Sequence, residues 1–184
     1  MKLIILDRDG VINFDSEHYI KCPDEWLPIP GSLAAIAKLK ELGYTIAIAS
    51  NQSGIARGLY TETTLQKIHE KMQRELSKLG AKIDFIVWCP HCPDDECVCR
   101  KPKTGMLQQI AEHFDCTLDN VYFVGDSASD VKAALAVKCI PILVKTGNGK
   151  STLAKFDNRF KLQAYANLLD FVENKLMGEE YAHD

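Results

Sequence analysis

The chain has 184 residues, of which 46% are hydrophobic and 26% charged, and its formal net charge is −3. This composition is typical of a globular protein, and the length predicts a single domain over residues 1–184. The slightly acidic charge argues against nucleic acid or a membrane as partner, and no apolar run approaches the ~18 residues that a membrane span needs.

The N-terminal segment predicts a buried strand that ends in a charged turn. Residues 3–6 are all apolar, and Asp7 and Asp9 follow directly. A strand buried on both faces has this pattern, and ligands of an open parallel sheet bind at the carboxyl ends of its strands. Two carboxylates so close together repel each other unless a cation lies between them, and a hard cation such as Mg²⁺ suits oxygen ligands.

Strand and helix patterns then alternate, which predicts an α/β fold: a doubly wound, three-layer sandwich around a mostly parallel five-stranded sheet. The later strands are predicted at residues 45–49, 84–88, 120–124 and 140–144. Helices are predicted at residues 32–42, 61–79, 104–114, 129–136 and 163–176. Thr61 is expected to cap its helix, Pro141 to place its strand at the sheet edge, and the end of the chain to fray.

Polar residues follow four of the predicted strands: Asp7 and Asp9, Ser50 and Asn51, Arg100 and Lys101, and Asp126 and Asp130. The carboxyl ends of parallel strands lie on one edge of a sheet, so these side chains can converge. They combine acids that can hold a cation, a hydroxyl and an amide that can bind an oxyanion, and a lysine that can neutralise charge. Phosphoryl transfer depends mainly on such positioning and charge stabilisation.

Four segments carry a resemblance to a known family. LDRDGVIN, ASNQSGIARG, CRKP and VGDSASD, in this order, are similar to motifs of the haloacid dehalogenase superfamily of phosphohydrolases. The match is closest to the D-glycero-D-manno-heptose-1,7-bisphosphate 7-phosphatases and the related histidinol-phosphate phosphatases. The resemblance implies a haloacid dehalogenase-like fold with a minimal cap made of loops. It also implies a Mg²⁺-dependent enzyme that removes the C7 phosphate of heptose 1,7-bisphosphate, in the supply of heptose for lipopolysaccharide or another glycan.

The resemblance implies a role for each motif residue. Asp7 would be the nucleophile that forms an aspartyl-phosphate, and Asp9 would protonate the leaving alkoxide and then activate water. Mg²⁺ would be held by the Asp7 side chain, the Asp9 backbone carbonyl and Asp126. Ser50 and the backbone N–H groups that follow it would bind the phosphoryl oxygens.

Two cations complete the implied site. Lys101 would offset charge between nucleophile and phosphate, and Arg100 would reach the sugar or its second phosphate. Asp130 would orient Lys101 or a metal-bound water. The further candidate substrate contacts are Asn51, Gln52, Ser53, Asp15 and Tyr19.

Residues 89–99 form a second cluster of candidate ligands, inserted after the third predicted strand: Cys89, His91, Cys92, Cys97 and Cys99. Three thiolates and one imidazole make a closed tetrahedral set suited to structural zinc. The resemblance implies Cys89, His91, Cys97 and Cys99 as the ligands. Cys92 is an alternative to His91 that would give an all-cysteine site. The loop leads directly into Arg100 and Lys101, so zinc would also fix where these cations point.

The seven cysteines are an odd number, and no export signal is recognisable at the N-terminus. We therefore expect a cytoplasmic protein without disulfides. Cys116 and Cys139 are expected in the core, and His69 at the surface or its boundary.

The alternatives to a heptose-bisphosphate phosphatase are three. Histidinol phosphate is another candidate substrate of the same class. A phosphomutase would share Asp7 and Asp9 but needs a closing cap that excludes water, and no segment looks long enough. A non-catalytic zinc-loop module would not need the acids and the lysine.

Without a large cap, the loops 13–30 and 89–101 must shape specificity, and such a small open site favours a monomer.

Overall fold

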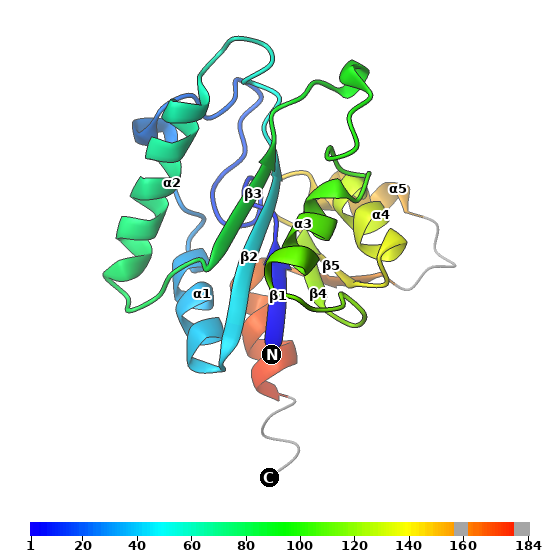
Figure 1. Cartoon of the computed structure of the whole chain (residues 1–184). Coiled ribbons are helices and arrows are strands. Elements are labelled where there is room, and N and C mark those ends of the chain that lie inside the picture. The colour runs from blue at the N-terminus through cyan, green and yellow to red at the C-terminus, as the bar shows by residue number, and fades with distance from the viewer. Residues whose placement is uncertain (157–161, 179–184) are drawn as a thin grey trace.

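A parallel sheet of six strands, in the order β3-β2-β1-β4-β5-β6, forms the centre of the computed structural model, which describes residues 1–156 and 162–178 (Figure 1). The strands are β1 (Lys2–Leu6), β2 (Tyr44–Asn51), β3 (Phe85–Cys89), β4 (Tyr122–Gly125), β5 (Ile140–Val144) and β6 (Gln163–Tyr165). The helices are α1 (Ser32–Glu41), α2 (Glu62–Ser77), α3 (Gly105–His113), α4 (Ala128–Ala136), α5 (Gly149–Lys155) and α6 (Leu168–Phe171), the last continued by a π-helical segment, Val172–Met177. The predicted doubly wound α/β fold is therefore confirmed, with one strand more than expected.

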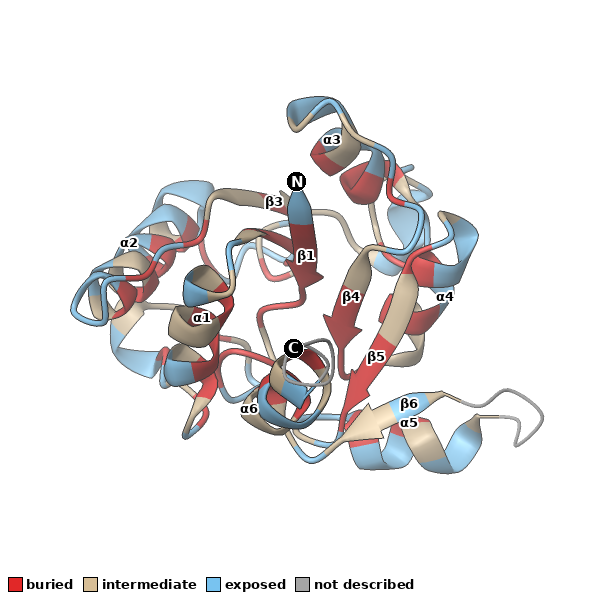
Figure 2. Cartoon of the chain, turned by 90° about the horizontal axis from the view of Figure 1, so that it is seen from below, coloured by how far each residue is buried: buried red, intermediate tan, exposed pale blue. Residues whose placement is uncertain are grey.

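β1 lies at the centre of the sheet, paired with β2 on one side and β4 on the other. Ile4 and Leu6 pack into the layer formed with α1, α2 and α6, whereas Leu3 and Ile5 pack into the layer formed with α3 and α4. Burying such side chains contributes about 1.5–3 kcal/mol each. This burial on both faces explains the apolar run at residues 3–6, which is the red part of β1 in Figure 2.

Side-chain caps fix the N-terminal ends of two helices, α2 and α4. Thr61 caps α2 as expected, because its hydroxyl accepts a hydrogen bond from the Thr64 backbone N–H. Ser127 caps α4 in a reciprocal capping box with Asp130. Thr104 precedes α3 as predicted, but its side chain makes no capping hydrogen bond.

The C-terminal part differs from the prediction. Gln163–Tyr165 pair with β5 as strand β6, so the helix expected from residue 163 starts only at Leu168. α5 is not predicted by the sequence, because its glycine start and polar residues carry no clear apolar period. The expected fraying of the chain end concerns residues 179–184, which lie outside the described residues.

The prediction that Pro141 marks an edge strand is wrong, because β5 lies between β4 and β6. The Ile140 backbone N–H donates to the carbonyl of Val121, just before β4, so the nitrogen of Pro141 faces the other side. β6 begins only opposite Ile142, and so no strand needs a hydrogen bond from Pro141.

Two smaller expectations can also be compared with the described residues. Cys139 is buried in the core, and Cys116 packs half-buried against it. None of the helices in the described ranges is both long and apolar enough to cross a bilayer.

Candidate active site

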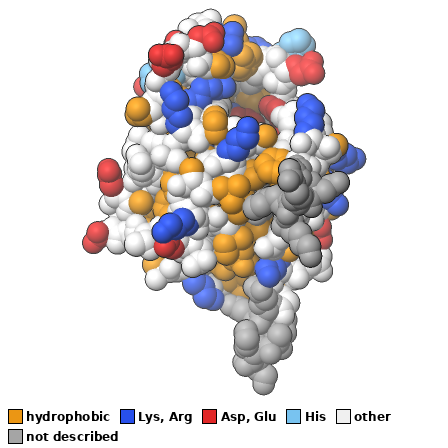
Figure 3. Space-filling view, turned by 90° about the vertical axis from the view of Figure 1, so that its right-hand side faces the viewer, with side chains coloured by type: hydrophobic (Ala, Val, Ile, Leu, Met, Phe, Trp, Pro, Cys, Tyr) orange, Lys and Arg blue, Asp and Glu red, His pale blue; other side chains and the backbone are white. Residues whose placement is uncertain are grey.

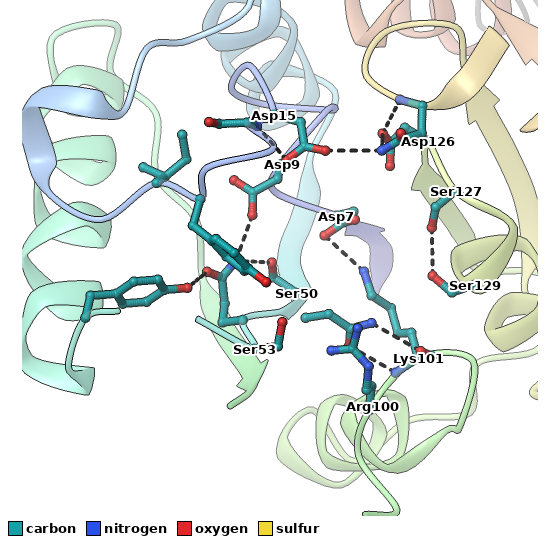
Figure 4. A pocket seen from close by; sticks show the side chains of 17 residues that line it. Asp7, Asp9, Asp15, Ser50, Ser53, Arg100, Lys101, Asp126, Ser127 and Ser129 are labelled. Atoms are coloured by element: carbon teal, nitrogen blue, oxygen red, sulfur yellow. Dashed lines mark hydrogen bonds and ion pairs between the residues drawn. The ribbon is translucent and has the colours of Figure 1, made fainter. Parts of the chain in front are cut away.

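The predicted polar segments meet around one cavity of about 300 Å³ at the carboxyl edge of the sheet (Figure 4). They come from the turn after β1, the end of β2, the segment after the cysteine-rich loop, the end of β4, and the β5–α5 loop. Basic side chains gather beside a hollow in the upper part of the face seen in Figure 3. The lining residues are Asp7, Asp9, Asp15, Ser16, Tyr19, Ile20, Ser50, Asn51, Gln52, Ser53, Tyr60, Arg100, Lys101, Asp126, Ser127, Ser129 and Asn148.

Asp7 lies directly after β1, and its backbone N–H continues the pairing with β4. Its Oδ1 accepts hydrogen bonds from the Arg8 backbone N–H at 2.7 Å and from Lys101 Nζ at 3.0 Å. Oδ2 is engaged by neither of these donors. Burial raises the pKa of Asp7 well above its usual value, although the charge of Lys101 opposes this. Asp7 therefore needs more positive charge nearby to be a stable carboxylate.

Lys101 is buried between two carboxylates. Its Nζ lies 2.7 Å from Asp130 Oδ1 and donates to the Ala49 carbonyl at 2.7 Å. Burial alone would lower the pKa of Lys101, but the charges of Asp130 and Asp7 raise it, so the ammonium is retained. The Asn51 side chain fixes the Lys101 backbone, because its amide both donates to the Lys101 carbonyl and accepts from the Lys101 N–H.

Three buried acids, Asp7, Asp126 and Asp130, place carboxylate oxygens within 4.8 Å of one another. Burial, followed by the charge of Asp130, raises the pKa of Asp126 to about 7, although a hydrogen bond from the Asn148 backbone N–H opposes this. One lysine cannot neutralise three carboxylates. All the donor atoms are hard oxygens, so the cluster fits a small divalent cation such as Mg²⁺. Asp130 is already held by Lys101 and Ser127, which leaves Asp7 and Asp126 as the freer ligands.

Asp9 lines the same cavity but faces a different set of partners. Arg8 donates to both of its carboxylate oxygens at 2.9 Å, and Asn13 and Gln52 add one hydrogen bond each. Burial alone would raise the pKa of Asp9, but the charge of Arg8 and the hydrogen bonds from the two amides lower it. The pKa values of these two carboxyl groups therefore shift in opposite directions, because Asp9 has a guanidinium partner and Asp7 is mainly desolvated.

The end of β2 supplies hydroxyl and amide groups. Ser50 is buried, and its Oγ accepts from Gln52 Nε2 at 2.8 Å. Gln52 thus links Ser50 to Asp9, while Ser53 lies further along the cavity wall. These groups are suited to binding phosphoryl oxygens.

The cysteine-rich loop brings together the four residues that the resemblance implied: Cys89, His91, Cys97 and Cys99. The sulfur and Nδ1 atoms in contact within this set lie 3.1–3.6 Å apart. A tetrahedral site with ordinary Zn–S and Zn–N bonds places ligand atoms about 3.5–3.8 Å apart, so the set fits zinc with a slight expansion. Cys92 stands outside this set, and its backbone N–H bonds to Asp95. Arg100 Nη1 donates to the His91 carbonyl at 3.2 Å, which ties the loop to the cavity.

Comparisons with known proteins agree with this geometry. A family model described as "Polynucleotide kinase 3 phosphatase" matches residues 2–169. The chain is 57% identical over 155 residues to a D-glycero-beta-D-manno-heptose-1,7-bisphosphate 7-phosphatase of Pseudomonas putida, covering 84% of this chain and 89% of that protein. It is 46% identical over 173 residues to the phosphatase of the same name from Neisseria meningitidis serogroup A, covering 93% and 92%.

A solved structure is similar over nearly the whole chain. The D,D-heptose 1,7-bisphosphate phosphatase of B. bronchiseptica, complexed with magnesium and phosphate, has a TM-score of 0.93 and 49% identity, covering 97% of this chain and 99% of that one. The chain belongs to the heptose-bisphosphate phosphatase family of the haloacid dehalogenase superfamily. The resemblance noted from the four motifs is thereby confirmed.

The structure also places residues at or next to the cavity that lie outside the four motifs and that the sequence did not single out. The Asn148 side chain, in the β5–α5 loop, donates to Asp126 and to Asp15 at the cavity rim. Thr146 in the same loop donates to the Gly10 carbonyl at 2.6 Å. This loop lies beyond the last motif, and only its position after a strand could have drawn attention to it.

A second missed group lies behind Asp9. Arg8, inside the first family motif, is 1% exposed, and Tyr60 donates to Gln52 Oε1 at 2.6 Å. The expectation that His69 lies near the surface is wrong: it is 7% exposed, and its Nε2 accepts from Arg8. An amphipathic helix pattern does not reveal that a histidine faces a buried arginine instead of solvent.

Proposed function

We propose that this chain is a Mg²⁺-dependent phosphoric monoester hydrolase that removes the C7 phosphate of D-glycero-D-manno-heptose 1,7-bisphosphate. One observation carries the proposal: a buried Asp7 contacts Lys101 and belongs to a cluster of three acids, in a chain 57% identical to a phosphatase named for this reaction. The neighbouring B. bronchiseptica enzyme binds magnesium and phosphate, which supports the same chemistry here.

In the first step, an Asp7 carboxylate oxygen attacks phosphorus, and the bond from phosphorus to the sugar oxygen breaks. The electron pair stays on that oxygen, which takes a proton from the Asp9 carboxyl group. Lys101, Ser50 and the N–H groups after Ser50 bind the phosphoryl oxygens while charge develops on them. Covalent catalysis thus divides one displacement into two.

In the second step, water attacks the phosphorus of the aspartyl-phosphate and Asp9 takes its proton. The bond from phosphorus to Asp7 breaks, inorganic phosphate leaves, and both aspartates return to their starting state. Asp7, the Asp9 backbone carbonyl and Asp126 would hold Mg²⁺. When bound, this ion neutralises charge on the carboxylates and the phosphoryl group.

The remaining residues have supporting roles in the proposal. Arg100 binds the sugar or its second phosphate, and zinc held by Cys89, His91, Cys97 and Cys99 would keep the loop, and through the His91 carbonyl Arg100, in place. Asp130 orients Lys101. The remaining proposed substrate contacts are Asp15, Tyr19, Asn51, Gln52 and Ser53.

We also propose a setting for this activity. The reaction would serve the synthesis of ADP-heptose or GDP-heptose precursors in the cytoplasm. A small open site of this kind favours a single-domain enzyme that acts as a monomer.

Steady-state kinetics on a panel of phosphate esters tests the substrate. The panel contains both anomers of heptose 1,7-bisphosphate, histidinol phosphate and common sugar monophosphates, each with saturating Mg²⁺. We expect the highest kcat/KM for one heptose bisphosphate anomer, and no turnover by Asp7→Asn. A preference for histidinol phosphate would overturn the substrate, and phosphate release by Asp7→Asn would overturn the mechanism.

A further inference from the structure

Arg8 is a buried cation next to the cavity, yet it is not among the residues that line it. Each nitrogen of its guanidinium has a partner within the protein. Nε and Nη2 donate to Asp9, Nη2 also donates to Gln52 Oε1, and Nη1 donates to His69 Nε2. Only one of the two Nη1 hydrogens is used in this way, but because Arg8 does not line the cavity, its guanidinium is not offered to a substrate there.

The partner that Arg8 holds does line the cavity. Arg8 grips both oxygens of Asp9, so the carboxylate cannot rotate without breaking two charge-assisted hydrogen bonds. Gln52 Nε2 donates to Asp9 Oδ2 at 2.7 Å and to Ser50 Oγ at 2.8 Å. The arginine and the glutamine thus fix the orientation of Asp9 from two sides.

A second layer fixes the two groups that hold Asp9. The Tyr60 hydroxyl donates to Gln52 Oε1 at 2.6 Å, and His69 on α2 accepts from Arg8 at 3.3 Å. The His69 ring in turn lies 5.7 Å from the Trp88 ring on β3. These contacts therefore connect Asp9, in the turn after β1, to helix α2 and strand β3.

Stability alone does not account for this arrangement. A buried ion pair is weak evidence for stabilisation, because its desolvation offsets the attraction, and apolar replacements are often neutral or better. A bidentate guanidinium is instead suited to holding a carboxylate in one orientation. General acid and base catalysis needs such an orientation, because the group must lie within hydrogen-bond reach of the proton it transfers.

We propose that Arg8 is a positioning residue of the reaction, which acts on turnover only by holding the Asp9 carboxylate toward the leaving oxygen and the attacking water. The inference rests on the phosphatase function proposed above, but not on the identity of the sugar. It requires that loss of Arg8 impairs the steps in which Asp9 transfers a proton and spares the attack by Asp7.

p-Nitrophenyl phosphate separates these steps. Its leaving group needs no proton, because the negative charge delocalises into the ring, so the attack by Asp7 can proceed without Asp9. The second step still needs a base for water. In Arg8→Met, we expect a burst of about one p-nitrophenolate per enzyme and then turnover about 100-fold slower than wild type, within the range of general acid–base effects. Asp9→Asn should behave in the same way, and the double variant should be no slower than Asp9→Asn alone.

Two further variants keep the test decisive. Arg8→Lys retains the charge but lacks the rigid planar fork of donors that fixes the carboxylate, so it should fold and still show the burst with slower turnover. Arg74→Met on the exposed side of α2 should match wild type. The proposal is overturned if folded Arg8→Lys turns over at the wild-type rate, if burst and turnover fall together in it, or if the double variant is additively slower. If the wild type hydrolyses p-nitrophenyl phosphate but not heptose bisphosphate, the proposed substrate is overturned. The test of Arg8 is unaffected, because it uses p-nitrophenyl phosphate.

Discussion

Lys101 Nζ lies 3.0 Å from Asp7 Oδ1, and both groups are buried at the carboxyl edge of the sheet. Asp7 lies in the first of the four motifs and Lys101 in the third, and they meet only because β1 and the segment after β3 reach the same edge. Asp130 holds the lysine from its other side at 2.7 Å. This geometry makes Lys101 both a structural counter-charge and a cation in direct contact with the proposed nucleophile.

The first prediction concerns this lysine. Lys101→Met leaves Asp7 and Asp130 buried without their counter-charge, so we expect the free energy of unfolding to fall by about 3–5 kcal/mol. The loss of a charge aimed at the phosphoryl group should lower kcat by about 10²–10³. Urea unfolding and steady-state kinetics measure the two effects. Lys78→Met, at an exposed position just after α2, should change neither; a wild-type kcat for Lys101→Met would contradict the prediction.

The second prediction concerns the β5–α5 loop. Gly147 has φ +51°, and a Cβ there would collide with Asp126 Oδ2 and the Gly10 backbone. In Gly147→Ala we expect the Mg²⁺ affinity to fall by about tenfold or more, because Asp126 must move. Backbone strain should also lower the free energy of unfolding by about 1–2 kcal/mol. Titration calorimetry with Mg²⁺ measures the affinity directly.

Gly43→Ala provides the matched control for this prediction. Gly43 has φ +79°, and a Cβ added there would meet nothing within 4 Å, so the variant has the backbone strain without the collision. It should lose similar stability and retain wild-type Mg²⁺ affinity. Equal Mg²⁺ affinities in the two variants would show that the loop does not position Asp126.

The third prediction concerns zinc. Cys97→Ser removes one of the four converging ligands, so we expect the bound zinc, about one equivalent per chain, to be lost. Because Arg100 bonds to the His91 carbonyl, kcat/KM for the bisphosphate should fall even with saturating Mg²⁺. Chelation of zinc from the wild type should have the same effect. Elemental analysis and kinetics on one preparation test both parts.

Cys92→Ser is the control, because Cys92 lies outside the ligand set. It should keep its zinc and its activity. Zinc loss in Cys92→Ser together with retention in a His91→Ala variant would instead favour an all-cysteine site.

The fourth prediction concerns pH. Burial, followed by the charge of Arg8, lowers the pKa of His69 to about 3. A histidine with a depressed folded-state pKa contributes stability above its unfolded pKa of ~6.5, and this contribution is lost as the pH falls from there toward 3. Between pH 7.5 and pH 5 the loss should be about 2 kcal/mol. His69→Gln, which stays neutral, should lack this part of the pH dependence in urea unfolding.

His113→Gln serves as the comparison for His69→Gln. His113 is exposed on α3 and stacks on Phe85 at 3.9 Å between ring centroids. The difference in unfolding free energy between pH 7.5 and pH 5 is measured in both variants, so that the effect at the buried position is compared with the same substitution at an exposed one. A wild-type pH dependence in His69→Gln would mean that His69 does not titrate on unfolding as described.

Several features followed from the sequence because they depend on neighbouring residues. The apolar run of β1, the acids that follow it and the Thr61 cap are each complete within a few positions. The four candidate zinc ligands lie within eleven residues, so chain connectivity alone keeps them close. The parallel α/β class then implied that strand ends share an edge, and the four motifs identified the family.

Tertiary structure alone decided the rest. The exclusion of Cys92 from the ligand set, the burial of Arg8 against Asp9 and the contact of Asn148 with Asp126 depend on how distant segments pack. β6 is three residues long and exists only because β5 offers it an edge. No local pattern encodes such partners, since a side chain's environment is set by the elements that pack against it, and these come from anywhere along the chain.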